Sequence, residues 1–266
     1  MMLSSMILGR YIPGDSVIHK MDPRSKIIMT VLFMAIVFMA NNTLTYAALI
    51  LFVLFVLALA KLNPIFVIKG LKIVFVLLIF TFLMHLFLTK GGTVLIDAGW
   101  FTIESEGIVR GVFIGTRLVM LVVITTIMTL TTSPISLTDA IEKMAHPLKK
   151  IKVPVHEIAM MMSISLRFIP TLMDETDKII KAQSSRGSTF MTGKVKDRIK
   201  ALLPIIIPLF VSAFQRAEDM AIAMEVRGYT GGEGRTSFRV LKWTFKDTLG
   251  IIFVILFGVL VWWLRT

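Results

Sequence analysis

The sequence carries the same short arginine–glycine pattern twice. The two copies lie 41 residues apart and read Ala182-Gln183-Ser184-Ser185-Arg186-Gly187 and Ala223-Met224-Glu225-Val226-Arg227-Gly228. An arginine guanidinium is a planar fork that pairs bidentately with carboxylates and keeps its charge when it is partly buried. The repeated pattern therefore predicts two equivalent docking points, centred on Arg186 and Arg227, for acidic surfaces of partner proteins.

Helix termination offers a simpler explanation of each copy taken alone. Both copies end a segment with the spacing of an amphipathic helix, about 155–185 and 203–226. A glycine at that point closes a helix in a left-handed turn, and an arginine there complements the negative end of the helix dipole. The duplication at matching helix ends favours docking, while the closing role of the glycines stays open.

Residues that would bind nucleotide or metal do not form a recognisable site. The segment from Gly187 to Gly193-Lys194 has five residues between its glycines instead of four, and Val195 replaces the Ser/Thr of a phosphate-binding loop. The glycine-rich run 231–236 has neither the lysine nor the spacing. No pair of the four histidines has metal-binding spacing, and there is no cysteine. We predict no cofactor in this chain, with ATP and magnesium bound by partner subunits.

The elements that must carry the two patterns are helices, most of them in a membrane. Hydrophobic residues make up 56% of the 266 residues and the mean hydropathy is +0.82, which is too apolar for a soluble domain. Apolar runs at 27–40, 45–60, 73–88, 108–130 and 249–264 predict about five transmembrane helices. The fold class expected is all-α and polytopic, divided into 1–26, a four-helix membrane region 27–131, a helical coupling region 132–246 and a final span 247–266.

Charge predicts the orientation of these spans. The net charge of +12 would suggest nucleic acid in a soluble protein, but here the basic residues gather between apolar runs. Basic loops lie before the first span, between the second and third, and after the fourth, which is typical of the cytoplasmic side of a cell membrane. We therefore predict a cytoplasmic amino terminus, a lipid bilayer as partner, and no nucleic acid.

Two further features concern helix packing. Gly107, Gly111 and Gly115 recur every four residues and leave a smooth stripe on the fourth span. We expect another helix of the same chain to pack there, with another subunit as the alternative. Pro204 and Pro208 interrupt an apolar stretch at 202–214 and predict a kinked helix there, although a short span remains the alternative.

The chain resembles the energy-coupling factor transmembrane subunit family (EcfT, also called the CbiQ family) over essentially its whole length. The segment His19-Lys20-Met21-Asp22-Pro23-Arg24-Ser25-Lys26 is similar to the family's H-x-L-D-P-R-x-K pattern, and both Arg–Gly motifs match. Ser185 and Val226 stand where the family often has alanine.

The resemblance implies a function and a set of partners. Each of two cytoplasmic coupling helices would insert its end into a groove on one of two ATP-binding-cassette subunits. The implied docking residues are Ser185, Arg186, Gly187, Val226, Arg227 and Gly228. A membrane-embedded substrate-binding S component would select the cargo, a vitamin or other micronutrient. The chain itself would be non-catalytic and would transmit ATP-driven motion to the S component.

Two other classes of function were weighed. A self-sufficient secondary transporter would need ion-coupling carboxylates in its spans, and no ladder of such residues is present. A membrane-embedded hydrolase would need a Ser/His pair, a carboxylate dyad or metal ligands at bilayer depth, and no convincing set stands out. The ATP-driven importer subunit is the leading hypothesis.

Overall fold

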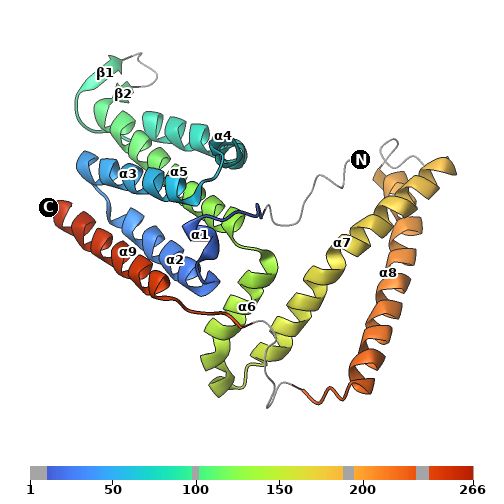
Figure 1. Ribbon diagram of the computed structural model, residues 1–266. Coiled ribbons are helices and arrows are strands. Elements are labelled where there is room, and N and C mark those ends of the chain that lie inside the picture. The colour runs from blue at the N-terminus through green and yellow to red at the C-terminus, as the bar shows by residue number, and fades with distance from the viewer. Residues whose placement is uncertain (1–10, 98–101, 188–194, 232–239, 266) are drawn as a thin grey trace. The chain divides into compact units, whose positions relative to one another are not determined.

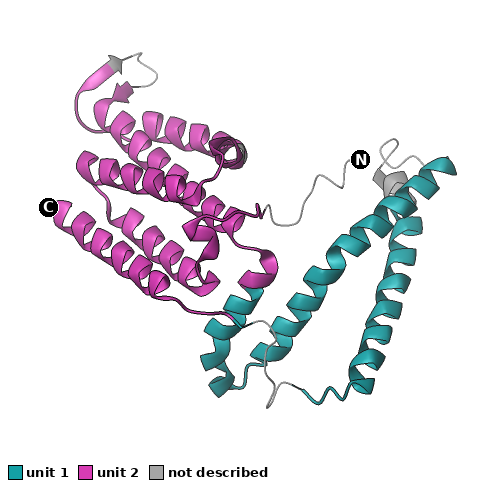
Figure 2. Cartoon of the chain, in the orientation of Figure 1, with its two compact units in different colours: residues 1–8, 138–240 teal, residues 9–137, 241–266 magenta. Residues whose placement is uncertain are grey.

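The computed structural model describes residues 11–97, 102–187, 195–231 and 240–265. The chain forms two compact units (Figures 1 and 2). One comprises residues 9–137 and 241–266 and is called the membrane unit below. The other comprises residues 1–8 and 138–240 and is called the coupling unit. The chain thus leaves the membrane unit after residue 137 and returns to it at residue 241.

Helices make up most of the membrane unit. Its helices within the described residues are α1 (Val17–Lys20), α2 (Pro23–Met39), α3 (Thr43–Ala60), α4 (Pro64–Leu88), α5 (Ser105–Thr131) and α9 (Phe245–Leu264). Polar residues begin them: Asp22, Asn42 and Asn63 each accept a backbone N–H of the first turn. A small antiparallel hairpin, β1 (Val94–Asp97) and β2 (Thr102–Glu104), joins α4 to α5 and was not predicted.

An aromatic stack forms the centre of this unit. The Phe52 ring of α3 lies 5.1 Å from Phe33 of α2 and 4.4 Å from Phe257 of α9, measured between ring centroids. Outward-facing side chains are also apolar, as with Val76 (74% exposed) and Trp263 (70% exposed). So much exposed apolar surface on both α4 and α9 is typical of helices that face lipid.

Fewer helices meet the requirements for a membrane span than the sequence predicted. Among the described residues, α3, α5 and α9 are long and apolar enough. Helix α4 is a fourth if its two arms, Pro64–Lys72 and Val74–Leu88, which are bent by 60°, form one span. The first predicted span coincides with α2, whose 17 residues rise about 25 Å against the roughly 30 Å of a hydrocarbon core. The helical membrane fold is confirmed, with three or four qualifying helices rather than five.

The glycine stripe packs within the chain, as expected, over two of its three positions. A Cβ atom on Gly107 would lie 2.8 Å from the His85 carbonyl oxygen, and one on Gly111 would lie 2.9 Å from the Phe82 ring. Both neighbours belong to α4. A Cβ on Gly115 would meet nothing within 4 Å, so the tight packing of the stripe against α4 does not include that position.

The coupling unit contains most of α6 (Pro134–Ala145), a 3-10 turn (His146–Ile151), α7 (Val155–Ser185) and α8 (Val195–Val226). Helix α7 spans the predicted range, and α8 begins eight residues before the predicted start at 203. Helix α8 continues through Pro204 and Pro208. It is not among the described helices that qualify as membrane spans.

Candidate functional site

Arg186 lies at the carboxyl end of α7. Its backbone N–H donates to the carbonyl oxygens of Ala182 and Gln183, at 3.3 and 3.1 Å, and the Gly187 N–H donates to Ser184 at 3.0 Å. Gly187 has φ +84°, a left-handed conformation that glycine adopts without strain. Ser185 donates its hydroxyl back to the Lys181 carbonyl at 3.1 Å. The chain therefore turns sharply away from the helix directly after Arg186.

Arg227 ends α8 in the same way. Gly228 (φ +70°) donates to the Glu225 carbonyl at 2.8 Å, and the Tyr229 N–H reaches back to Met224 at 2.9 Å. These two bonds form a Schellman motif. Nothing lies within 4 Å of a Cβ built on either Gly187 or Gly228. Backbone conformation, and not lack of space, explains both glycines, so the helix-closing role left open by the sequence is correct.

Closing the helix does not account for the arginine side chains. Both arginines are exposed, and neither guanidinium makes a hydrogen bond or ion pair with the residues that the structure describes. Val226, next to Arg227, is 82% exposed although it is apolar. Each helix end thus presents an exposed arginine that has no partner among the described residues, and the second also presents an exposed apolar side chain beside it.

The two helix ends point in opposite directions. Helices α7 and α8 run antiparallel (Figure 1), held by an ion pair between Glu175 and Arg216, and Ser212 donates to the same carboxylate at 3.0 Å. Arg186 follows Glu175 by 11 positions and Arg227 follows Arg216 by 11. At about 1.5 Å per residue, the two arginines therefore lie roughly 30 Å apart along the pair, on either side of the ion pair.

The same 41-residue offset relates all four of these residues. It takes Glu175 to Arg216 and Arg186 to Arg227. In an antiparallel pair, this relation places the two Arg–Gly ends at equal distances along the helices, on opposite sides of the ion pair. The 41-residue repeat in the sequence thus corresponds to two arginines placed symmetrically about the ion pair.

Replacing Gly228 with alanine tests the geometry of one helix end. We expect Gly228→Ala to destabilise the terminal turn by about 1 kcal/mol, because an L-residue resists positive φ. Hydrogen exchange measures this, as faster exchange of the Tyr229 amide. Gly228→Asn is the matched control and should exchange more slowly than Gly228→Ala, since asparagine tolerates this conformation. Equal protection in all three proteins would contradict the assignment.

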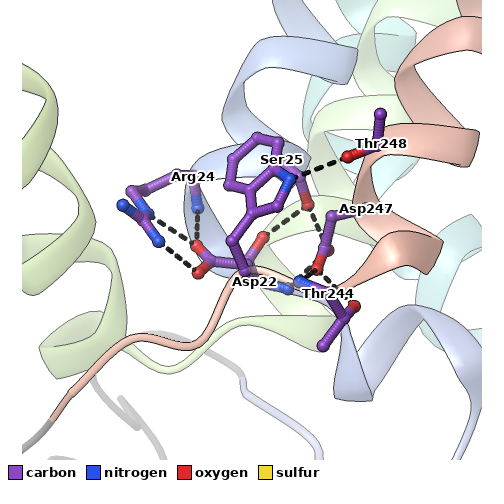
Figure 3. Close-up of polar contacts among 7 residues, drawn as sticks. Asp22, Arg24, Ser25, Thr244, Asp247 and Thr248 are labelled. Atoms are coloured by element: carbon purple, nitrogen blue, oxygen red, sulfur yellow. Dashed lines mark hydrogen bonds and ion pairs between the residues drawn. The ribbon is translucent and has the colours of Figure 1, made fainter.

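A second polar cluster lies in the membrane unit, where α2 begins beside α9 (Figure 3). Asp22 accepts two bonds from the Arg24 guanidinium, at 3.1 and 2.8 Å, and Arg24 in turn lies over the Trp243 ring, 5.4 Å from its centroid. The Asp22 backbone N–H donates to Oδ1 of Asp247 at 2.8 Å. Part of the segment that resembles the family pattern thus forms a contact with a residue 225 positions away.

Asp247 is the centre of this cluster and is fully buried. Its Oδ2 accepts the backbone and hydroxyl hydrogens of Thr244, at 2.8 and 2.6 Å. The Ser25 hydroxyl lies 2.7 Å from both Oδ1 of Asp247 and the Asp22 carbonyl, so its one proton goes to one of these acceptors. Sequence reasoning missed Asp247, although a Thr three residues before an acid is the pattern of a helix start.

Two basic side chains of the membrane unit make structural hydrogen bonds that the sequence analysis did not predict. Lys26 is 5% exposed and donates to the Thr131 carbonyl at 2.8 Å and to the Thr132 hydroxyl at 3.3 Å. Arg117, within the span formed by α5, donates to the Ala40 carbonyl at 3.1 Å. An arginine inside an apolar run is a signal that the sequence did offer.

Histidines take part in local bonds. His19 lies 2.6 Å from the Ser16 hydroxyl and 3.0 Å from the Ile12 carbonyl, and His156 pairs with Glu142 at 2.9 Å. Within the described ranges, no group of three His, Asp or Glu side chains is placed to hold a metal ion. The two glycine-rich segments weighed as phosphate loops, 187–194 and 231–236, lie almost wholly outside the described residues.

Comparison with known proteins agrees with the resemblance noted from the motifs. The sequence profile of CbiQ, described as cobalt transport protein, matches residues 14–238. The chain is 53% identical to the energy-coupling factor transporter transmembrane protein EcfT of Bacillus subtilis (strain 168), over 99% of this chain and 100% of the relative. It is 54% identical to EcfT of Listeria innocua, over the full length of both, and 50% identical to EcfT of Staphylococcus aureus, over 99% and 98%. The chain therefore belongs to the CbiQ family of cobalt transport proteins, together with the EcfT transmembrane proteins of energy-coupling factor transporters.

Proposed function

We propose that this chain is the coupling component of an ATP-driven importer and that Arg186 and Arg227 are its two contacts with the ATPases. The observation that carries the proposal is a pair of guanidinium groups that have no partner among the described residues and lie at opposite ends of one antiparallel helix pair. Two similar ATPase subunits need two similar docking points, and the two arginines, each 11 residues beyond the ion pair, would supply them. A separation of roughly 30 Å leaves room for one subunit at each end.

Docking at these points gives the helices a mechanical role. Each arginine would pair with a carboxylate in a groove of its ATPase, and the glycine turn keeps the following chain out of that groove. Closure of the ATPases around nucleotide would then move both helix ends. The Glu175–Arg216 ion pair would make α7 and α8 move together.

An apolar strip on α8 supports a further partner. Ile207, Phe210 and Phe214 are 59%, 60% and 69% exposed and lie on one face of the helix. A membrane-embedded S component that carries the cargo would cover apolar surface of this kind. Methionines 220 and 224 line the neighbouring groove between α7 and α8, where their flexible side chains suit a changing partner or simply fill space. The cargo, a vitamin or other micronutrient, would be chosen by that component.

The remaining assignments follow from this division of labour. The chain would be non-catalytic and hold no cofactor, with ATP and magnesium bound by the ATPases. The basic segments at 20–26, 61–72 and 143–152 would face the cytoplasm, where the ATPases reside, which puts the amino terminus inside.

Purification of the tagged chain from its own membrane tests the proposal. We expect two ATP-binding-cassette subunits to co-purify in stoichiometric amounts, and the complex to hydrolyse ATP while the chain alone does not. Reconstituted vesicles should import solute only with the ATPases and an S component present. Solute transport by the chain alone would identify a secondary carrier and overturn the proposal.

A further inference from the structure

Three polar residues at the start of α2 contact the segments next to the two places where the chain passes from one unit to the other. The chain leaves the membrane unit at residue 137, shortly after α5, and returns at residue 241, shortly before α9. Lys26 donates hydrogen bonds to Thr131 and Thr132, shortly before the chain leaves the membrane unit. Asp22 and Ser25 contact the Asp247 carboxylate, shortly after the chain returns to the membrane unit. We refer to Asp22, Ser25 and Lys26 as the α2 clamp.

Burial indicates that these contacts are specific. The clamp residues are 4%, 0% and 5% exposed, and their partners Asp247, Thr131 and Thr132 are 0%, 1% and 6% exposed. Burying so many polar groups is unfavourable unless each finds a partner. Apolar residues would pack α2 against α5 and α9 without that requirement, but they would not fix the position of one helix end against another so closely.

Charge reinforces the same arrangement. The clamp brings together the amino end of α2, the amino end of α9 and the carboxyl end of α5. Asp22 and Asp247 lie at the two amino ends, and the Lys26 ammonium lies at the carboxyl end. Each charge is therefore opposite in sign to the helix dipole that it faces. Arg24 adds a cation–π contact with Trp243, which precedes α9.

We propose that the α2 clamp is the fixed joint through which motion of the coupling unit enters the membrane helices. The clamp fixes the end of α5 and the start of α9 against the start of α2. A displacement of α7 and α8 would therefore move α5 and α9 together, and would not be lost in flexible connections between the two units. The clamp residues are positioning residues for coupling. This inference rests on the proposed function, since it assumes that the coupling unit is driven by ATPases.

A reversible covalent clamp tests the joint directly, because the chain has no cysteine. The variant Ser25→Cys/Asp247→Cys removes the polar contact when reduced and replaces it with a disulfide when oxidised. The assay uses vesicles that hold the chain, its two ATPases and an S component for riboflavin, with labelled riboflavin as the probe. ATP hydrolysis and riboflavin uptake are measured on the same vesicles.

We expect the reduced variant to hydrolyse ATP but to import roughly ten-fold less riboflavin per ATP, a size typical of coupling between sites. Oxidation should restore import towards that of the wild-type protein. Equal coupling in the reduced variant and the wild type would overturn the inference. So would an oxidised variant that is inactive until it is reduced, because the joint would then have to open during transport.

Lys26→Met tests the outgoing side by a single change. We expect the same loss of import per ATP with the ATPases still bound. Lys20→Met is the matched control, since Lys20 is exposed and, among the described residues, its ammonium group pairs only with the exposed Asp15. If Lys26→Met lowers thermal stability but leaves import per ATP unchanged, its role is merely structural and the clamp is not a joint. Wild-type vesicles that import riboflavin without ATP would instead contradict the proposed function itself.

Discussion

Reversal of both docking charges, Arg186→Glu with Arg227→Glu, is expected to release the ATPases from the membrane protein and to abolish ATP-driven import. Removing one partner of a buried interfacial charge pair costs about 2–5 kcal/mol, and a glutamate adds repulsion from the carboxylates that the arginine served. Because the two ends are equivalent and far apart, their effects should add. Co-purification of the ATPases with the tagged chain measures the loss, and import by reconstituted vesicles measures its consequence.

Single variants and a matched control make this result specific. Each single charge reversal should weaken one of the two ATPase contacts and leave the other. Lys181→Glu changes the same charge on an exposed position of α7, five residues before Arg186, and should leave assembly intact. A double variant that assembles and transports normally would show that the arginines only close their helices.

Local signals made the ends of the coupling helices predictable. Arg186-Gly187 and Arg227-Gly228 end amphipathic segments, and both helices stop at the residue before the arginine, as expected. The end of such a helix depends on the backbone preference of one glycine, which can be read directly from a single sequence. The start of α4 was not predictable in this way. The sequence predicted a basic loop between the second and third spans, whereas α4 begins at Pro64 and its bent first arm forms most of that segment.

Long-range contacts explain most of what the sequence did not reveal. Ser25 and Asp247 are separated by 222 positions, and no periodicity or motif connects them. Asp22 has both kinds of contact: an aspartate directly before a proline is a local signal of a helix start, whereas nothing local indicates its backbone contact with Asp247. The two Arg–Gly helix ends are therefore defined by local turns, whereas the α2 clamp is defined by tertiary packing.

Gly107 connects this argument to stability. The stripe of three glycines predicted close helix packing without indicating where it would be tightest. The structure indicates one end, because a Cβ at Gly107 would lie 2.8 Å from the His85 carbonyl oxygen and 3.1 Å from that of Thr89. These are backbone atoms at the end of α4, so they cannot turn aside as a flexible side chain would.

Gly107→Ala is therefore expected to force α4 away from α5 and to destabilise the folded protein by about 1–3 kcal/mol, as overpacking does. Thermal unfolding of the purified protein in detergent measures the change. Gly115→Ala is the matched control on the same helix: its Cβ meets nothing within 4 Å, and alanine is the better helix former by about 1 kcal/mol. Gly115→Ala should thus be neutral or slightly stabilising. If the two variants unfold at the same temperature, the close contact between α4 and α5 at Gly107 is not what holds this pair of helices together.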